Sequence, residues 1–533
     1  MTPLAVKDPA TQIGAAWLAR YFWLVAAALL AVRMLLGALC NLVPDEAFYW
    51  TWTRHLSTGY FDHPPMIAWL MWLSTHLLGN TELGVRFPAA VLSIGSLAVL
   101  VGIGRQVLPD ARAVGLVILM WISGPLLPVI GTIVTPDAPA TFFSVCALAC
   151  AVAAANLDDR NDRSDSPSGA RGQRAGGLWL LFGLFCGLAL LSKYTTVLVP
   201  VGVALALLTS RQGRRHFARP WLYLAGLIAL AVFSPCIYWN YKHQWVSFLF
   251  QINHGAGGGS TEGLHGFLPR LLSVAGFVGG QAAVWTPILF VIAVVVMFAN
   301  WRGYGKLCGV DRLLLWSGTL PLVFFGVMSA RSHGEMNWPA FAYFPLSLLV
   351  SRYFAENWRR NRVQWIQMGC GVALGFTVGV HLLAVPAVQQ VLLRSGVPLT
   401  HQITDLWGWP QFGRQLSETA NGFPVVCNRH QDAGEAAFYM PGQPDVWCDG
   451  IAFRPTAFDY FDTGQPDFAR EPQVLFVADP RHVDPFMKKW KYTQKWDMPK
   501  VVMPGLGKNR SHSATRLGRY VWPVLPRLAE RQN

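Results

Sequence analysis

Two neighbouring carboxylates near the start of the chain are the first residues whose type and position suit chemistry. Asp45 and Glu46 follow directly on an apolar stretch (roughly residues 21–43), and Asp62 and His63 come shortly before a pair of prolines. Acidic side chains at a membrane boundary are costly unless they have a function there. A carboxylate in this setting can take a proton from an attacking hydroxyl, or stabilise positive charge at a sugar carbon.

Each of these residues also has a structural interpretation. Pro44 and Asp45 are typical of the first turn of a surface helix. The prolines Pro64 and Pro65 fix a turn that would hold Asp62 and His63 in place whether or not they react. In the functional interpretation, His63 contacts a phosphate or carries a proton.

Two further charged residues lie beside apolar spans later in the chain. Asp137, in the segment Thr135-Pro136-Asp137, opens one span, and Lys193 interrupts the most apolar part of the sequence. Helix capping would explain Asp137, and snorkelling to the membrane surface would explain Lys193. The functional interpretation places Asp137 in the same cavity as Asp45, and has Lys193 hold a phosphate as a compact cation.

A polar loop, RSHGEMNWP (331–339), carries another candidate for phosphate binding, Arg331. The alternative is an interfacial loop whose Trp338 belongs to an aromatic belt. The sequence has no HExxH, Walker or GxSxG motif and no pair of CxxC motifs. Metal-protease, nucleotide-triphosphatase and serine-hydrolase chemistry therefore have no support in the sequence.

The composition is that of an integral membrane protein. Of 533 residues, 53% are hydrophobic and 14% are charged, against about 25% charged in a soluble domain. The net charge of +14 does not indicate nucleic-acid binding, because Lys and Arg occur in short clusters between apolar spans. The first apolar run lacks a cleavage site of small residues and is expected to stay as an anchor.

The hydropathy pattern predicts about eleven spans, and the charge bias orients them. They lie near 18–42, 84–104, 113–132, 136–156, 177–191, 194–210, 220–240, 270–299, 313–330, 338–351 and 364–387. The segment 65–79 is better interpreted as a helix along the membrane interface. Basic clusters fall in alternate connections, which places the N-terminus in the cytoplasm. Asp45, Asp137, Lys193 and Arg331 then share the outer face.

The fold class predicted is an all-α polytopic membrane protein with a small α/β periplasmic domain at the C-terminus. We expect a transmembrane catalytic domain over 1–387 and the periplasmic domain over 388–533. Phe423 to Val426 and Val474 to Val477 are the expected strands. Cys427 and Cys448 would be able to pair as a disulfide if this region lies outside the cytoplasm.

Taken together, these motifs resemble a known superfamily. The acidic pair after the first span, the YFDHPP segment, TPDAP, LSKYT and the run NRHQDAGEAAFYMPGQPDV (428–446) resemble bacterial GT-C membrane glycosyltransferases. The similar branches are the protein-mannosyltransferase-like and lipid A aminoarabinose-transferase-like proteins (the RgtA/B/C/D-like family). The resemblance covers nearly the whole chain and is strongest over 44–90 and 131–200.

The resemblance implies a donor whose sugar is carried on a polyprenyl phosphate, typically undecaprenyl phosphate. It implies that Asp45 is the catalytic aspartate, and that Asp62 and Asp137 are further acidic positions of the family. Lys193 resembles a family cation and would hold the donor phosphate. His63 stands where the aminoarabinose transferases carry a Lys.

We therefore expect a glycosyltransferase of a bacterial inner membrane, with its active site facing the periplasm and a lipid or glycan acceptor. Asp45 and Asp137 are the predicted catalytic residues; the predicted substrate-binding residues are Glu46, Asp62, His63, Lys193 and Arg331. No cofactor is required, although three carboxylates are able to hold a divalent metal. The alternative is a transporter or flippase for lipid-linked saccharides, since polar groups in a membrane cavity serve that role too. Neither the sugar nor the acceptor follows from the sequence.

Overall fold

The computed structural model divides into two compact units. Unit 1 holds Met1–Gly37, His63–Ile67 and Arg86–Val380; unit 2 holds Ala38–Asp62, Ala68–Val85 and His381–Asn533. Residues 38–62, which carry Asp45, thus group with the C-terminal part of the chain. The structure describes residues 9–161, 169–256, 266–332, 334–356, 408–448, 455–461, 473–478 and 513–518, and single positions between 371 and 395.

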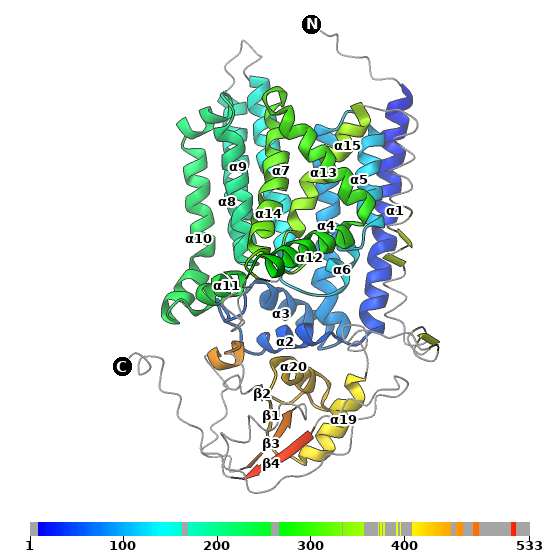
Figure 1. Cartoon of the computed structure of the whole chain (residues 1–533), viewed down its shortest axis with the longest axis vertical. Coiled ribbons are helices and arrows are strands. Elements are labelled where there is room, and N and C mark those ends of the chain that lie inside the picture. The colour runs from blue at the N-terminus through cyan, green and yellow to red at the C-terminus, as the bar shows by residue number, and fades with distance from the viewer. Residues whose placement is uncertain are drawn as a thin grey trace. The chain divides into compact units, whose positions relative to one another are not determined.

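Unit 1 is helical in its described residues (Figure 1). Its α-helices, some of which extend a few residues beyond the unit, are α1 (Pro9–Leu39), α4 (Glu82–Val107), α5 (Ala111–Ser123), α6 (Leu126–Thr132), α7 (Asp137–Asn161), α8 (Gly169–Leu190), α9 (Leu198–Leu208), α10 (Trp221–Lys242), α11 (Val246–Ala256), α12 (Phe267–Trp285), α13 (Pro287–Arg302), α14 (Gly309–Ser329) and α15 (Tyr343–Glu356). Short 3₁₀ turns are η1 (Tyr194–Val197), η2 (Gly213–Ala218), η3 (Tyr304–Lys306) and η4 (Ala340–Ala342).

Seven helical segments among the described residues are long and apolar enough to cross a membrane: Tyr21–Leu39, Glu82–Val107, Asp137–Leu157, Gln173–Leu190, Trp221–Lys242, Phe267–Trp285 and Gly309–Ser329. Four shorter apolar helical segments accompany them: Met66–Leu78, Ala113–Ser123, Tyr194–Leu208 and Pro287–Arg302. The predicted all-α polytopic class is confirmed. The number of eleven spans stays a prediction, because 364–387 lies largely outside the described residues.

Two predicted spans are wrong in their continuity, because each is two helices in the structure. The stretch 270–299 is two helices, because α12 ends at Trp285 and α13 begins at Pro287. Pro287 has no N–H with which to continue the helix before it, and Thr286 between them has φ +65°. Figure 1 shows α12 crossing the bundle at a steep angle to α14. The predicted span 113–132 is likewise broken, between α5 and α6, at Gly124-Pro125.

The predicted division around Lys193 is confirmed. Helix α8 ends at Leu190, and η1 begins at Tyr194. Lys193 has an extended backbone between them (φ −157°, ψ 127°). Helices α7, α8, α9, α10 and α14 pack side by side (Figure 1). Gly183 lets α8 approach α10 closely, since a Cβ at this position would lie 2.2 Å from the carbonyl oxygen of Ala225. This packing fixes the end of α8 and, with it, Lys193.

Unit 2 combines helices with a four-stranded sheet. Its elements are α2 (Pro44–Trp52), α3 (Met66–Leu78, which begins in unit 1), α19 (Trp409–Ala420), β1 (Val425–Cys427), α20 (His430–Tyr439), β2 (Val446–Cys448), η6 (Ala457–Tyr460), β3 (Gln473–Ala478) and β4 (Ser513–Gly518). The sheet order is β2-β1-β3-β4; β1 is parallel to β2 and β3, and β4 is antiparallel to β3. Strands therefore form at both predicted places. A separate α/β domain over 388–533 stays a prediction.

Cys427 and Cys448 lie opposite each other on neighbouring strands, in the register of β1 and β2. Both are buried and both side chains are thiols in the structure. Burial and the nearby Asp432 carboxylate raise the pKa of the Cys427 thiol well above its usual value. The thiol form is therefore favoured over the reactive thiolate.

Candidate functional site

A buried ion pair in unit 1 joins two of the predicted site residues. Lys193 Nζ donates to Asp137 Oδ1 at 2.7 Å. The side chains are only 11% and 7% exposed, so the pair is buried. Asp137 is the first residue of α7 and Lys193 lies between α8 and η1, so the packing of these helices brings two residues together across 56 positions.

The second oxygen of Asp137 is also occupied. Asn337 Nδ2 donates to Asp137 Oδ2 at 2.6 Å. Thr135 Oγ1 is 3.4 Å from the same oxygen and accepts from the Asp137 backbone N–H at 3.3 Å. The carboxylate is thus held from both sides. These bonds orient the ammonium of Lys193, and the predicted catalytic role of Asp137 stays a prediction.

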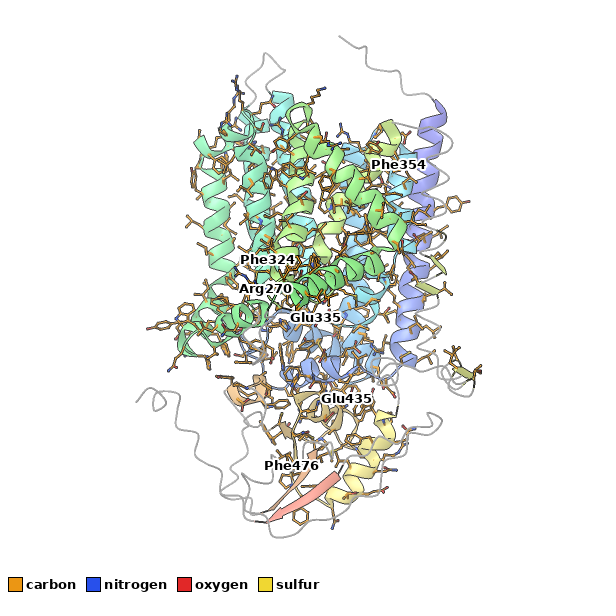
Figure 2. The ribbon with its side chains drawn as sticks, viewed as in Figure 1. Arg270, Phe324, Glu335, Phe354, Glu435 and Phe476 are labelled. Carbon is orange, nitrogen blue, oxygen red and sulfur yellow. The ribbon has the colours of Figure 1, made fainter. Side chains whose placement is uncertain are left out.

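The loop that supplies Asn337 is fastened to its neighbours through its backbone. Gln281 of α12 donates from Nε2 to the carbonyl of Met336 at 3.1 Å. Tyr343 in turn donates to Gln281 Oε1 at 2.7 Å, and both side chains are buried. In Figure 2, Glu335 of this loop and Phe354 of α15 lie toward opposite ends of the helices of unit 1. The Asp137 cluster therefore belongs to one end of that unit.

Arg331 and His63 also belong to unit 1. Arg331 is exposed at the start of the loop, just after α14, and its backbone N–H donates to the carbonyl of Met328. His63 is half-buried before Pro64. Their predicted phosphate contacts stay predictions.

The acidic pair of α2 divides into one exposed and one buried residue. Asp45 is exposed, whereas Glu46 is fully buried. Glu46 Oε2 accepts from the backbone N–H of Val43 at 2.9 Å, so it satisfies a donor at the start of the helix. Pro44 at the first turn and the two acids favour this helix start. The contact of Glu46 is structural, and its role in substrate binding stays a prediction.

Helix α2 is held in unit 2 by the motif that the sequence singled out at 428–446. Its buried rings pack against α20, where a Cβ on Gly434 would lie 2.5 Å from the backbone nitrogen of Phe48. Tyr439 of α20 accepts from the backbone N–H of Leu42 at 2.7 Å and donates to Glu82 at 3.1 Å. These contacts fix the backbone of α2, the helix that carries Asp45.

Asp62 is buried as well, and its Oδ2 accepts from the backbone N–H of Ala457 at 3.2 Å. Beside it, Phe61 stacks on Tyr460 with 5.2 Å between ring centroids. Asp62 thereby anchors η6, and its predicted substrate contact stays a prediction. The sequence missed Asn337, Gln281 and Tyr343, because no local pattern indicates contacts made across 55 to 200 positions.

No group of three His, Cys, Asp or Glu side chains that could hold a metal ion occurs among the described residues. The donor set at Asp137 does not fit a divalent cation, since one oxygen faces an ammonium and the other an amide. The expectation that no cofactor is required stays a prediction.

Comparison with known proteins gives consistent matches. A family profile described as dolichyl-phosphate-mannose-protein mannosyltransferase matches residues 62–239. The lipid A galacturonosyltransferase RgtD of Rhizobium johnstonii is 26% identical over 406 residues, covering 74% of this chain and 76% of that protein. An undecaprenyl phosphate-alpha-4-amino-4-deoxy-L-arabinose arabinosyl transferase of Sodalis glossinidius is 25% identical, over 69% of this chain and 63% of that one.

A solved structure has the same fold as this chain over most of the length of both proteins. ArnT from Cupriavidus metallidurans bound to undecaprenyl phosphate aligns with a TM-score of 0.60 at 16% identity, covering 94% of this chain and 98% of that one. At this identity the likeness shows the fold alone, and the chain has the fold of ArnT.

Proposed function

We propose that this chain, a multi-span membrane glycosyltransferase of the GT-C type related to ArnT and RgtD, transfers a sugar from a polyprenyl-phosphate donor to lipid A or a related envelope acceptor. The single observation that carries the donor half of the proposal is the buried Lys193, held by Asp137 at 2.7 Å. A cation this well buried and oriented is suited to gripping a phosphate. The relatives' names support the lipid-borne donor and the lipid A acceptor.

Lys193 would act on the leaving group. When the bond between the anomeric carbon and the phosphate oxygen breaks, the polyprenyl phosphate leaves with one more negative charge. An ammonium with two N–H donors beyond the one directed at Asp137 is able to stabilise that charge. His63 and Arg331 are proposed to assist in phosphate binding. The phosphate ester is already an activated leaving group, so the mechanism needs no nucleotide.

Asp45 is proposed to act on the acceptor. Its exposed carboxylate takes the proton of the acceptor hydroxyl, and the oxygen attacks the anomeric carbon from the side opposite the phosphate. A single displacement of this kind inverts the configuration of the sugar. The proposed location is a bacterial inner membrane with the active site facing the periplasm, which is supported by the charge bias of the connections.

The test uses the purified full chain in detergent with polyprenyl phosphates that carry isotope-labelled galacturonic acid, aminoarabinose or a neutral hexose, and with lipid A as acceptor. We expect labelled lipid A and an equal amount of free polyprenyl phosphate, both measured by mass spectrometry. A chain that moves intact donor across vesicle membranes but forms no glycosidic bond would contradict the proposal.

Orientation has its own test. A single cysteine is introduced at position 45 in cells, and its labelling by a membrane-impermeant thiol reagent is compared with that of a cysteine at position 312, in a predicted cytoplasmic connection. We expect reagent added outside the inner membrane to reach position 45 alone. Labelling of position 312 alone would reverse the proposed topology.

A further inference from the structure

The contact between Asn337 and Asp137 points to a residue that neither the motifs nor the proposed mechanism includes. We propose that Asn337 is a positioning residue that keeps Lys193 able to bind the donor phosphate. This inference rests on the proposed function for its substrate and on three groups of unit 1 for its geometry: Lys193, Asp137 and Asn337.

Asp137 shares its negative charge between two hydrogen-bond donors. Its Oδ1 accepts from Lys193 at 2.7 Å, and its Oδ2 accepts from Asn337 at 2.6 Å. A hydrogen bond to a carboxylate disperses part of its negative charge. The ammonium is therefore oriented by Asp137 without being fully neutralised by it. If the amide is removed, more of the carboxylate charge acts on Lys193, and a phosphate competes less well for the same cation.

The position of Asn337 is set by neighbours that do not themselves touch the ion pair. Gln281 holds the preceding carbonyl, of Met336, and is itself held by Tyr343. The Asn337 carbonyl accepts from the backbone N–H of Ala340 at 3.1 Å. Because Gln281 and Tyr343 are buried to 1% and 0% exposure, the loop has a fixed register against α12 and α15. An amide held in this way is preorganised to bond the carboxylate.

The charge of the cluster depends on which side chain stands at position 337. Lys193 comes from the α8–η1 connection and Asp137 from α7, while Arg331 and Glu335 lie on the same loop as Asn337. The contacts from α12 are made by the uncharged Gln281 and by Ser273, which donates to the carbonyl of Ser332 at 3.3 Å. Within the Lys193–Asp137 pair one ammonium faces one carboxylate, and an aspartate at position 337 would add a second carboxylate to that contact.

Three substitutions test this inference. Asn337→Leu removes the amide at similar volume, and Asn337→Asp replaces it with an acid of nearly the same shape. Asn300→Leu is the matched control, because the Asn300 amide donates to the carbonyl of Val296 within its own helix, α13. Melting temperature and gel-filtration profile are recorded for each full-length variant, so that loss of folding is separated from loss of binding.

The first measurement is the affinity for undecaprenyl phosphate in detergent micelles, taken between pH 5 and pH 8 and divided by the wild-type value at each pH. We expect Asn337→Leu to weaken binding about tenfold at every pH. Asn337→Asp is expected to weaken it about a hundredfold at pH 8 and to recover at least tenfold by pH 5. Two carboxylates in contact raise the pKa of one of them, so acid restores a neutral donor at this position. Asn300→Leu should follow the wild type throughout.

The second measurement is transfer by the same preparations. Both Asn337 variants are expected to raise the KM for the donor more than they lower kcat, because the bond lost acts on binding of the phosphate. A folded Asn337→Asp variant with wild-type affinity and a flat normalised pH profile would overturn the inference, as would a folded Asn337→Leu variant with unchanged affinity.

Gln281→Leu keeps the test valid if both Asn337 variants fail to fold. It loosens the loop without touching Asp137, so we expect a smaller loss of affinity that does not vary with pH. Unchanged affinity in that variant would then overturn the inference. If the wild type transfers no sugar from any donor, the proposed function fails, while undecaprenyl phosphate binding still decides the role of Asn337.

Discussion

Asp45 and Asp137 are both carboxylates at the start of a helix, and the sequence assigned both to catalysis. In the structure, Asp45 is exposed in the first turn of α2, while Asp137 is buried and bonded on both oxygens. Glu46, which follows Asp45 in the sequence, is buried as well and accepts a hydrogen bond from the backbone N–H of Val43 at the start of α2. Burial therefore separates the solvent-exposed Asp45 from two acids, Asp137 and Glu46, whose hydrogen bonds hold other groups in place.

Asp45→Asn should give the largest effect on activity. The amide keeps the shape of the side chain but cannot take a proton, and general-base catalysis contributes about 10²- to 10⁴-fold in rate. We therefore expect the rate of transfer to fall by at least about 10²-fold, with an unchanged melting temperature. The matched control is Asp110→Asn, which alters an acid that caps α5 by accepting a hydrogen bond from the backbone N–H of Ala113. Near-normal transfer by the Asp45→Asn variant would remove Asp45 from the mechanism.

Asp137→Ala should give the largest effect on stability. Removing one member of a buried ion pair leaves the other charge uncompensated and costs about 3–5 kcal/mol. We expect a loss of that order in the free energy of unfolding, measured by denaturant titration in detergent, and a loss of donor binding. The double substitution Asp137→Ala with Lys193→Met should recover part of the stability but none of the binding.

Glu46→Gln probes the other member of the α2 pair. The amide oxygen is still able to accept from Val43, so we expect a loss of about 1 kcal/mol in stability, typical of a weakened helix cap. Transfer by this variant should change much less than in Asp45→Asn. An equal loss of transfer in both variants would mean that the acids act together, and the contrast between exposed and buried carboxylates would fail.

Arg352→Gln should have the smallest effect. Arg352 pairs with Asp311 between α14 and α15 at 2.7 Å, but its side chain is 29% exposed. Partly exposed pairs contribute about 0.2–1 kcal/mol and are screened by salt. We expect a small, salt-sensitive drop in melting temperature and an unchanged KM for the donor. A loss of donor binding here would show that the Asp137–Lys193 pair has no special role.

The sequence predicted those parts of the molecule that local patterns determine. Apolar runs identified the helices of unit 1, and the Ser192-Lys193-Tyr194 interruption marked the division between α8 and η1. The same patterns could not show that α12 and α13 are separate, since a single Pro287 within an apolar run is compatible with either a kink or a break.

The candidate site shows the same limit. Acids and cations were recognised by type, but the partners of each depend on tertiary packing. Nothing near Asn337 in the sequence indicates that its amide contacts Asp137, and nothing near Glu46 distinguishes it from Asp45. The pairing of Asp137 with Lys193 follows from the packing of α7 against α8.

The central claim is that Lys193 holds the donor while Asp45 drives the attack. Radiolabelled polyprenyl-phosphate sugar bound to purified Asp45→Asn and Lys193→Met tests it most directly, when binding and single-turnover transfer are measured on the same samples. We predict wild-type donor binding without product for Asp45→Asn, and loss of binding for Lys193→Met. Product formation by Asp45→Asn at the wild-type rate, or wild-type donor affinity in Lys193→Met, would contradict the account.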